Sequence, residues 1–366
     1  MQSINMNKKH IIFHIPIEIL ATRHSASQIR PLQMINAFRE NGYVVDIVAG
    51  QISERKKKIA IIKHKIKSGV KYDFLYAESS TMPTLLTESH HLPLHPFVDF
   101  DFFSFCKSKN IKIGLFYRDI YWCFEEYGND LKKKIAKLFY KYDLNKYNKL
   151  LDILFIPSLE MLEYIPFKIK VPTYSLPPGV PILEEDNYTM INSKTIEILY
   201  VGGIGGHYNL KKIISVISNL ENIHLTICCR KEDWIIEKKD YEHLLNDNIS
   251  IVHKFGNELH KYYKNADLFC LFVEPQVYWN FCVPYKLFES IGYNCPILAS
   301  EGTWVAKFCK KNKLGITCKY DVENLKELLS TVNRKEILTM KNKINDFALL
   351  NTWQKRCEEI SKLLKR

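Results

Sequence analysis

Short apolar runs alternate with amphipathic stretches along almost the whole of this chain. In the first half the runs are HIIFHIP, YVVDIVAG, YDFLYAES, IKIGLFYRD and LDILFIPS, with helical spacing between them at 28–41, 52–68, 97–109 and 131–149. In the second half IEILYVGG, HLTICCR, ISIVHKFG, DLFCLFVEP and PILASE repeat this rhythm. Continuous apolar strands that alternate with helices are typical of parallel sheets buried on both faces. The pattern predicts an α/β fold with two doubly wound parallel-sheet domains.

The two halves are separated by a segment without a clear period, SLPPGVPILEEDNYTMINSKT, at 175–195. Two adjacent prolines, a glycine and a polar run predict a linker. We therefore expect a first domain at 1–178, a linker at 179–195, a second domain at 196–345 and a C-terminal helix at 346–366. Ligands of doubly wound sheets bind beyond the carboxyl ends of the strands, so we expect the loops after each strand to line a cleft between the domains.

Composition narrows the class of protein and of partner. The chain has 366 residues, of which 46% are apolar and 25% charged, and this excludes a disordered or fibrous protein. A net charge of +12 indicates an anionic partner, which is nucleic acid, an acidic membrane surface or a phosphate-bearing substrate. The ten cysteines are scattered without a CxxC pair, which favours reduced thiols in a cytoplasmic protein over a disulfide scaffold or a zinc site.

The turn after IEILYV reads GGIGGHYNLKKI and is the first candidate for ligand binding. Its four glycines precede a helix that we expect to start near Asn209. Glycines let the backbone approach a ligand, and the N–H groups of a helix start favour phosphate. The spacing does not match GxGxxG, so the dinucleotide fingerprint is not met. The alternative is a tight turn that needs positive φ angles.

Charged residues stand at two more expected element ends of the second half. Arg230 ends the run HLTICC, where a guanidinium can pair with a phosphate through two hydrogen bonds. Lys286 and Glu289 lie three residues apart on the helix predicted for VPYKLFESIGYNCPILAS, so both can serve one site. A glutamate there can accept two hydrogen bonds from a vicinal diol such as a ribose. The alternative is a surface Lys–Glu pair.

Taken in order, these segments resemble the nucleotide-sugar-binding domain of GT-B glycosyltransferases, in particular the retaining family 4 enzymes. The resemblance rests on YVGG with its glycine-rich turn, a strand that ends in a basic residue, FGNELHKYYKNADLFCLF, PYKLFESIGYNCPILAS and EGT. It implies two Rossmann-like domains that face a cleft, with the C-terminal helix returning to the first domain. It also implies a nucleotide-sugar as co-substrate, without a metal or another cofactor.

The resemblance assigns Glu289 to the ribose hydroxyls of the donor. The first of the family's two glutamates falls at Phe281, so that pattern is broken, and Glu274 is the expected substitute. The Arg and Lys that neutralise the donor diphosphate in the family fall at Gly203 and close to Asn209, so we expect Arg230 and Lys286 to replace them. The expected donor-binding set is Gly203, Gly205, Gly206, Asn209, Arg230, Glu274, Lys286 and Glu289.

In the first half, LFYRDIYW looks like the version found in bacterial capsule and surface-polysaccharide transferases. Related enzymes end this strand in a His-Asp pair beside the reacting sugar, and the resemblance makes Arg118 and Asp119 the catalytic candidates. The alternative is an internal Arg–Asp pair that fixes the loop. The expected acceptor-side residues, from the loops after the first and third strands, are Ser25, Ser27, Gln28 and Glu78.

Three further features leave alternatives open. Arg30, in the same loop region as the acceptor-side residues, can instead pair structurally with Glu40 or a similar neighbour. His90, His91 and His95 lie close together, and surface-loop histidines are a commoner explanation than a metal site. The basic segments SERKKKIAIIKHKIKSG and LKKKIAKLFYKYDLNKYNK predict either solvated helices docked on their sheet or contact with an anionic membrane, where lipid-linked acceptors reside.

The function expected from the sequence is transfer of a sugar from a nucleotide-sugar to a glycan or lipid-linked acceptor in bacterial surface-polysaccharide synthesis, with retention. The protein is then cytoplasmic, or peripheral at the inner face of the cell membrane. The alternatives are a GT-B epimerase or phosphorylase, or a degenerate GT-B binding protein. Nucleic acid is disfavoured as a partner, because the chain has neither aromatic-lined basic strands nor a recognised binding module.

Overall fold

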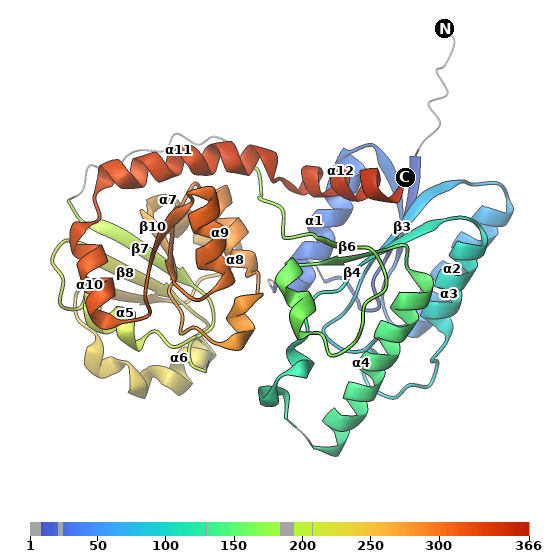
Figure 1. The fold of residues 1–366 in the computed structure, drawn as a ribbon, viewed down its shortest axis with the longest axis horizontal. Helices are drawn as coiled ribbons and strands as arrows, with labels where there is room; N and C mark the ends of the chain where they lie inside the picture. Colours follow the sequence, from blue (N-terminus) through green and yellow to red (C-terminus); the bar gives the residue numbers. More distant parts are fainter. Residues whose placement is uncertain (1–8, 21–24, 129, 184–193, 207, 366) are drawn as a thin grey trace, which may run out of the picture. The chain divides into compact units, whose positions relative to one another are not determined.

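The chain forms two compact units in a computed structural model, which describes residues 9–20, 25–128, 130–183, 194–206 and 208–365. Unit 1 comprises Met1–Pro178 and Trp353–Arg366, and unit 2 comprises Gly179–Thr352. Each unit is built around a six-stranded parallel sheet with helices on both faces (Figure 1). The expected α/β fold with two doubly wound sheets is confirmed.

Unit 1 has the strand order β2-β1-β3-β4-β5-β6. Its strands are β1 (Lys9–His14), β2 (Tyr43–Val48), β3 (Tyr72–Glu78), β4 (Lys112–Phe116), β5 (Ile153–Ile156) and β6 (Thr173–Ser175). Its helices are α1 (Ala26–Glu40), α2 (Ile52–Lys67), α3 (Val98–Ser108), α4 (Leu131–Leu150) and α12 (Trp353–Leu364), with 3-10 turns η1 (Thr84–Leu86), η2 (Tyr121–Cys123), η3 (Glu125–Tyr127) and η4 (Leu159–Tyr164). β1 pairs with β2 on one side and with β3 on the other. The chain therefore leaves β1 and β3 in opposite directions along the sheet, and doubly wound sheets bind ligands at such a point.

Unit 2 has the order β12-β11-β10-β7-β8-β9. Its strands are β7 (Ile196–Val201), β8 (Ile223–Cys228), β9 (Ile249–Val252), β10 (Leu268–Leu271), β11 (Ile297–Ser300) and β12 (Gly315–Cys318). Its helices are α5 (Lys211–Ile217), α6 (Lys231–Glu237), α7 (His260–Asn265), α8 (Tyr285–Gly292), α9 (Trp304–Asn312), α10 (Val322–Thr331) and α11 (Arg334–Leu350), with 3-10 turns η5 (Lys238–Asp240), η6 (Glu242–Leu244), η7 (Gly256–Leu259) and η8 (Val277–Asn280). Here the loops after β7 and β10 diverge at the equivalent point.

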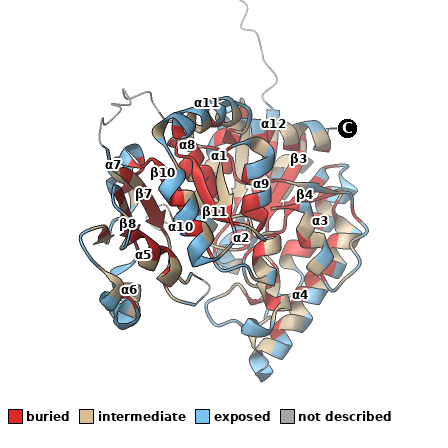
Figure 2. Cartoon of the chain, turned by 60° about the vertical axis from the view of Figure 1, so that its left-hand side comes forward, coloured by how far each residue is buried: buried red, intermediate tan, exposed pale blue. Residues whose placement is uncertain are grey.

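Alternate residues of the unit 2 strands enter two different cores. Ile198 and Tyr200 pack on one face of the sheet with α5 and α10, whereas Leu199 and Val201 pack on the other face with α7, α8 and α9. Figure 2 shows the strands as the most buried layer. Burial on both faces explains why these strands read as continuous apolar runs in the sequence.

The C-terminal helix α12 belongs to unit 1, although α11 before it belongs to unit 2. Cys357, Ile360 and Leu364 are buried on α12. A Cβ on Gly114 of β4 would lie 2.9 Å from a methyl group of Leu364, so glycine permits this close approach. α11 continues through residue 345, where we expected the second domain to end. Of the expected linker at 179–195, residues 184–193 lie outside the described residues.

Helix α4 buries one carboxyl group, that of Asp143, which is only 3% exposed. Its Oδ2 accepts the backbone N–H of Thr84 at 2.7 Å. Burial raises the pKa of Asp143 to about 7, because the charged form loses hydration. Among the helices of the described residues, none is long and apolar enough to cross a membrane.

We predict that Asp143 makes unit 1 less stable as the pH rises. Its folded pKa lies above the ordinary value of 3.8, so its stabilising contribution is present below about pH 4 and is lost as the pH rises to about 7. Asp143→Asn keeps an acceptor for Thr84 and cannot ionise. Thermal unfolding is measured for both proteins from acidic to alkaline pH. Above pH 7 the free energy of unfolding of the variant is expected to exceed that of the wild type by on the order of 3 kcal/mol. Identical pH profiles for the two proteins would contradict the prediction.

Candidate functional site

The glycine turn after β7 is closed by its own backbone. Gly205 and Tyr208 exchange hydrogen bonds of 3.3 and 3.0 Å, and the hydroxyl of Tyr200 donates to the carbonyl of Gly203 at 2.5 Å. The φ angles of Gly205 and Gly206 are +87° and +55°, in the region that disfavours side chains. A Cβ on Gly205 would also lie 2.4 Å from the carboxylate of Glu237. Gly205 and Gly206 are therefore required by the tight turn itself, which needs positive φ angles, whether or not a ligand binds.

The helix after this turn starts slightly later than expected, at Lys211. The side-chain oxygen of Asn209 accepts the backbone N–H of Lys211 at 2.9 Å. Asn209 thus satisfies one of the N–H groups that we expected to face a phosphate. Because α5 is only seven residues long, its dipole adds little to a site.

Lys286 and Glu289 form a supported pair on α8. Lys286 Nζ lies 2.5 Å from Glu289 Oε2, and the hydroxyl of Tyr263 donates to the same oxygen at 2.9 Å. The ring of Tyr263 is stacked on that of Tyr293, with centroids 4.4 Å apart. The side chains of Lys286 and Glu289 are 28% and 19% exposed. This pair is fixed in position by a buried tyrosine, unlike an ordinary surface ion pair.

The end of β8 brings a second basic residue to this region. Burial raises the pKa of the Cys228 thiol at the end of β8, and the positive charge of Lys286 opposes that shift. Arg230 follows two residues later as the exposed N-cap of α6. Arg230 and the Lys286–Glu289 pair thus stand on segments that follow the carboxyl ends of β8 and β10, at one edge of the sheet in unit 2.

In the loop after β10, Phe281 stands at the position of the first of the family's two glutamates, and this part of the loop is packed. Phe281 is 3% exposed and packs against the ring of Tyr278 at 5.3 Å, so this position is part of the core of the loop. Glu274 is exposed near the start of the same loop. Two aromatic residues that we did not predict, Tyr208 and Trp279, meet at 5.6 Å and join this loop to the glycine turn. The sequence signal that could have revealed this contact is the presence of aromatic residues in both of the loops that follow β7 and β10.

A cavity of about 680 Å³ lies elsewhere in unit 2. Its lining includes Glu197, His224, Asp267, Arg334 and Lys341. Glu197 and His224 stand near the amino ends of β7 and β8, and Asp267 immediately precedes β10. Since the predicted donor residues follow the carboxyl ends of the strands, this cavity is separate from them.

In unit 1, Arg118 pairs with Glu78 and thereby joins the loop after β4 to the end of β3. Arg118 Nη2 lies 2.9 Å from Glu78 Oε2, and its backbone N–H donates to Ser79 Oγ at 3.0 Å. Burial lowers the pKa of Arg118, and the neighbouring guanidinium of Arg30 adds to this. The described ion pair of Arg118 is thus with Glu78, whereas the internal pair that we considered joined an arginine to an aspartate.

Glu78 is fully buried, so our expectation that it lines an open acceptor rim is wrong. Arg30 Nε lies 3.3 Å from Glu78 Oε1, and the hydroxyl of Tyr76 donates to that oxygen at 3.1 Å. Arg30 therefore has the structural pairing that we considered, but its partner is Glu78, while Glu40 accepts a hydrogen bond from Gln354. A buried carboxylate needs cationic partners, and two guanidinium groups supply them here.

The other candidate residues of unit 1 differ in how far they are buried and in the hydrogen bonds that their side chains make. Asp119 is half-buried, and its Oδ1 accepts the N–H groups of Ile120 and Tyr121 at 2.6 and 3.1 Å, which fixes the carboxylate at the start of η2. Ser25 and Ser27 hydrogen-bond each other at 2.9 Å and are partly exposed. Gln28 is buried and holds the loop after β1, where it accepts the N–H of Leu20 at 2.7 Å.

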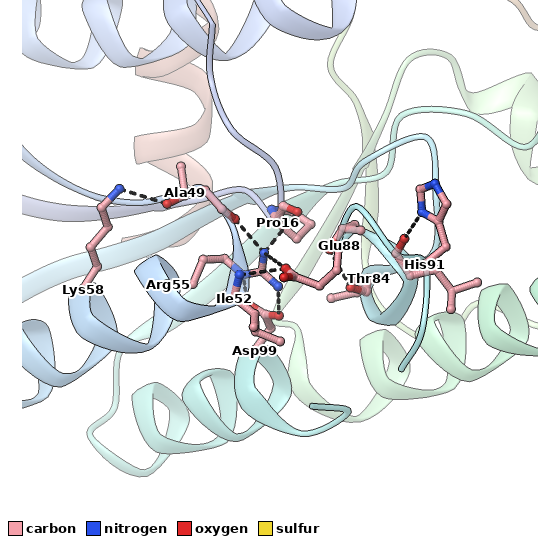
Figure 3. A network of polar contacts seen from close by, with 12 residues as sticks. Pro16, Ala49, Ile52, Arg55, Lys58, Thr84, Glu88, His91 and Asp99 are labelled. Atoms are coloured by element: carbon pink, nitrogen blue, oxygen red, sulfur yellow. Dashed lines mark hydrogen bonds and ion pairs between the residues drawn. The ribbon is translucent and has the colours of Figure 1, made fainter. Parts of the chain in front are cut away.

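A second buried network in unit 1 was not predicted (Figure 3). Arg55 donates twice to Asp99 at 3.0 Å and also to the carbonyls of Gly50 and Pro16, which follow β2 and β1. Although burial raises the pKa of Asp99, hydrogen bonds from His14 and the charge of Arg55 outweigh it, and the pKa lies below the ordinary value. Arg55 stands in a lysine-rich run of the sequence, and the order of residues in that run does not indicate that Arg55 is buried.

The loop histidines do not converge in the described part of the chain. His91 Nδ1 lies 2.9 Å from the carbonyl of Leu86, whereas His95 Nδ1 lies 3.2 Å from Lys56 Nζ. No group of three His, Cys, Asp or Glu side chains suited to a metal is found among the described residues.

We predict that Glu78 and Arg30 are energetically coupled. Glu78→Gln leaves two buried guanidinium groups without a counter-charge and is expected to cost about 3–5 kcal/mol in urea unfolding. Arg30→Met in the Glu78→Gln background removes one of these charges, so the double variant is expected to lose at least about 1 kcal/mol less than the sum of the single variants. The control Glu163→Gln changes an exposed carboxylate in the same unit. Additive losses would contradict the coupling.

Comparisons with solved structures relate the whole chain to known folds. Sucrose-phosphate synthase from Thermosynechococcus elongatus is 12% identical, with 97% of this chain and 98% of that chain covered and a TM-score of 0.66. Anabaena HepE in complex with UDP is 10% identical, with 97% and 99% covered and a TM-score of 0.67. WaaG, a glycosyltransferase involved in lipopolysaccharide biosynthesis, is 11% identical, with 96% and 99% covered and a TM-score of 0.57. At these identities the likeness shows the fold, which is GT-B.

A comparison of sequence relates the second unit to a known family. No curated protein matches this chain at a significant level. Residues 182–347, almost all of unit 2, match the family model described as glycosyl transferases group 1. Unit 2 is therefore similar to glycosyl transferases group 1, in a chain that has the GT-B fold.

Proposed function

We propose that this chain transfers a hexose from a nucleotide-sugar to a glycan or lipid-linked acceptor of bacterial surface-polysaccharide synthesis, with retention of the anomeric configuration. The observation that carries the proposal is the fixed Lys286–Glu289 pair on α8, with Arg230 following β8 at the same edge of the sheet in unit 2. The match of this unit to group 1 glycosyl transferases supports a sugar-transfer reaction. HepE, which shares the fold, was solved with UDP and with UDP-glucose, and WaaG is involved in lipopolysaccharide biosynthesis.

Glu289 is suited to bind the ribose of the donor. Tyr263 and Lys286 both contact its Oε2 and fix the orientation of the carboxylate. Its Oε1 makes no hydrogen bond with the described residues and remains an acceptor for a ribose hydroxyl. A carboxylate held in one rotamer loses little entropy when it accepts such a bond.

Lys286 and Arg230 are suited to bind the diphosphate. The ammonium group of Lys286 has three donors, of which one is directed to Glu289. The side chain of Arg230 is exposed and makes no hydrogen bond or ion pair with another described residue, so its guanidinium can pair with phosphate oxygens through two hydrogen bonds. Both cations would stabilise the negative charge that develops on the departing nucleoside diphosphate.

Transfer with retention needs no general base from the protein. The donor phosphate can accept the proton of the incoming hydroxyl, and the new bond then forms on the face that the leaving group vacates. Asp119, oriented by the N–H groups of Ile120 and Tyr121, is the proposed group that orients the acceptor or stabilises the oxocarbenium-like charge. Arg118 would act as a positioning residue for this loop through Glu78.

Binding measurements on single variants test the donor site. Lys286→Ala and Arg230→Ala are each expected to weaken nucleoside diphosphate binding by about 10- to 100-fold, because each removes a charged hydrogen bond. Inorganic pyrophosphate binding should weaken in parallel. Glu289→Gln should weaken the nucleotide by about tenfold and leave pyrophosphate unchanged, since it affects the ribose.

Lys310→Ala is the matched control, because Lys310 is an exposed lysine of the same unit that lies on α9. Titration calorimetry should give wild-type affinity for this variant. Unchanged nucleotide affinity in Lys286→Ala, Arg230→Ala and Glu289→Gln would contradict the proposed donor site.

The products of slow donor hydrolysis separate the proposed reaction from its alternatives. The donor is the nucleotide-sugar that raises the melting temperature most in a thermal-shift screen. Proton NMR is expected to show release of the free sugar with its original anomeric configuration. An epimerised sugar would indicate an epimerase, a sugar 1-phosphate formed only with added phosphate would indicate a phosphorylase, and binding without turnover would indicate a binding protein.

A further inference from the structure

Strand β8 has polar side chains on one face, although a parallel sheet covered by helices is usually apolar on both faces. Leu225 is fully buried, whereas its neighbours His224 and Thr226 point to the other face and are only partly buried. The adjacent strands also carry polar groups there, since Glu197 of β7 pairs with His224 and Ser250 of β9 pairs with Thr226. The fold therefore leaves this part of the sheet in unit 2 incompletely covered.

The cavity of about 680 Å³ lies over this polar face. Glu197, His224 and Thr226 line it from the sheet, and residues of α7 and α11 complete its wall. Its volume is within the range of about 300–1,000 Å³ that is typical of sites for small molecules, which combine apolar walls with a few polar groups. The apolar part of the wall includes Leu199, Tyr262, Ile337 and Leu338.

Both acidic side chains of the lining already have partners within unit 2. Asp267 Oδ1 lies 2.9 Å from Arg334 Nη1, and Asp267 Oδ2 accepts the backbone N–H of Glu197 at 3.0 Å. Glu197 Oε2 lies 2.8 Å from His224 Nδ1, and His224 Nε2 lies 2.9 Å from the hydroxyl of Ser250. The negative charges that line the cavity are therefore held by groups of the unit itself.

Lys341 on α11 keeps most of its hydrogen-bonding capacity. Its Nζ donates to the carbonyl of Ala266 at 3.5 Å, and no carboxylate of the described residues pairs with it. An ammonium group has three donors, so Lys341 can bind an anion as well. Leu338, one turn earlier on the same helix, is 45% exposed, and Lys264 of α7 is an exposed second cation of the lining. Cations beside an exposed apolar side chain fit a ligand that joins an anionic group to an apolar body.

We propose that this cavity is a second ligand site of unit 2, which binds a small amphipathic anion through Lys341 and through the apolar wall that includes Leu338 and Tyr262. The anionic group accepts hydrogen bonds from the ammonium group, and the apolar body of the ligand covers the exposed leucine. The cavity stands near the amino ends of β7 and β8, whereas the proposed donor residues follow the carboxyl ends of β8 and β10. Binding in the cavity is therefore independent of the proposed donor site.

Fluorescence titration of the full chain with 8-anilinonaphthalene-1-sulfonate tests the site, because this dye joins a sulfonate to an aromatic body. Its uncharged analogue, N-phenyl-1-naphthylamine, is the matched probe without the anionic group. K341Q is expected to weaken binding of the sulfonate by about tenfold or more and to leave the uncharged analogue unchanged, because it removes a charged hydrogen bond. L338S should weaken both dyes by about three- to tenfold, because it removes apolar contact area.

Two exposed residues of α11 that do not line the cavity supply matched controls. K343Q removes an exposed lysine, and L349S removes a leucine that is 69% exposed. Both variants should bind the two dyes as the wild type does. Nucleoside diphosphate binding, measured in parallel, should be unchanged in all four variants, so failure of the donor site and failure of the cavity site give different results.

Hydrogen–deuterium exchange locates the bound dye. The sulfonate is expected to protect residues 334–342 of α11, and protection confined to other segments would overturn the proposal. Equal affinity of the wild type, K341Q and L338S for the sulfonate would also overturn it, as would displacement of the dye by a nucleoside diphosphate, which would assign the dye to the donor site.

A last variant distinguishes a free ligand from the chain itself as the occupant. Replacement of residues 184–193, which lie outside the described residues, by glycine and serine should leave the affinity for the sulfonate unchanged. Binding of the dye to this variant alone would assign the cavity to a segment of the chain and would contradict the proposal.

Discussion

Parallel strand pairing determines where chemistry can occur in this protein. Every strand of each sheet runs in the same direction, so all the carboxyl ends of a sheet lie at one edge, and the loops that follow them lie together. In unit 2 this edge collects the glycine turn, Arg230 and the loop that leads to α8. In unit 1 it collects the loops after β1, β3 and β4. Residues far apart in the sequence become neighbours for this reason alone.

Buried ion pairs hold those loops in unit 1. Glu78 lies at the end of β3 and binds guanidinium groups from α1 and from the loop after β4. Asp99 on α3 binds Arg55 on α2, which in turn holds the carbonyls after β1 and β2. Such pairs contribute little net stability, but each is costly to break because the remaining charge stays buried. They therefore specify loop positions, and Asp119 stands on one of the loops so held.

The sequence was informative where the physical signal is local or periodic. Continuous apolar runs identified the strands, and the spacing of Lys286 and Glu289 on one helix face was visible before the structure. Ion pairs between residues far apart in the sequence could not be predicted from it. Glu78 looked like a rim residue because nothing in YAESS reveals two arginines from distant segments. Likewise the two lysine-rich helices look alike in sequence, and only side-chain exposure separates α4 from α2.

We propose that the carboxyl edge of unit 2 binds the nucleotide of a sugar donor. Hydrogen–deuterium exchange of the full chain, with and without the nucleoside diphosphate that stabilises it most, tests this claim directly. Protection is expected in the glycine turn at 202–206, after β8 at 229–234 and along α8 at 285–292. Protection confined to the residues of the cavity at the amino ends of the strands, such as Glu197, His224 and Arg334, would contradict it.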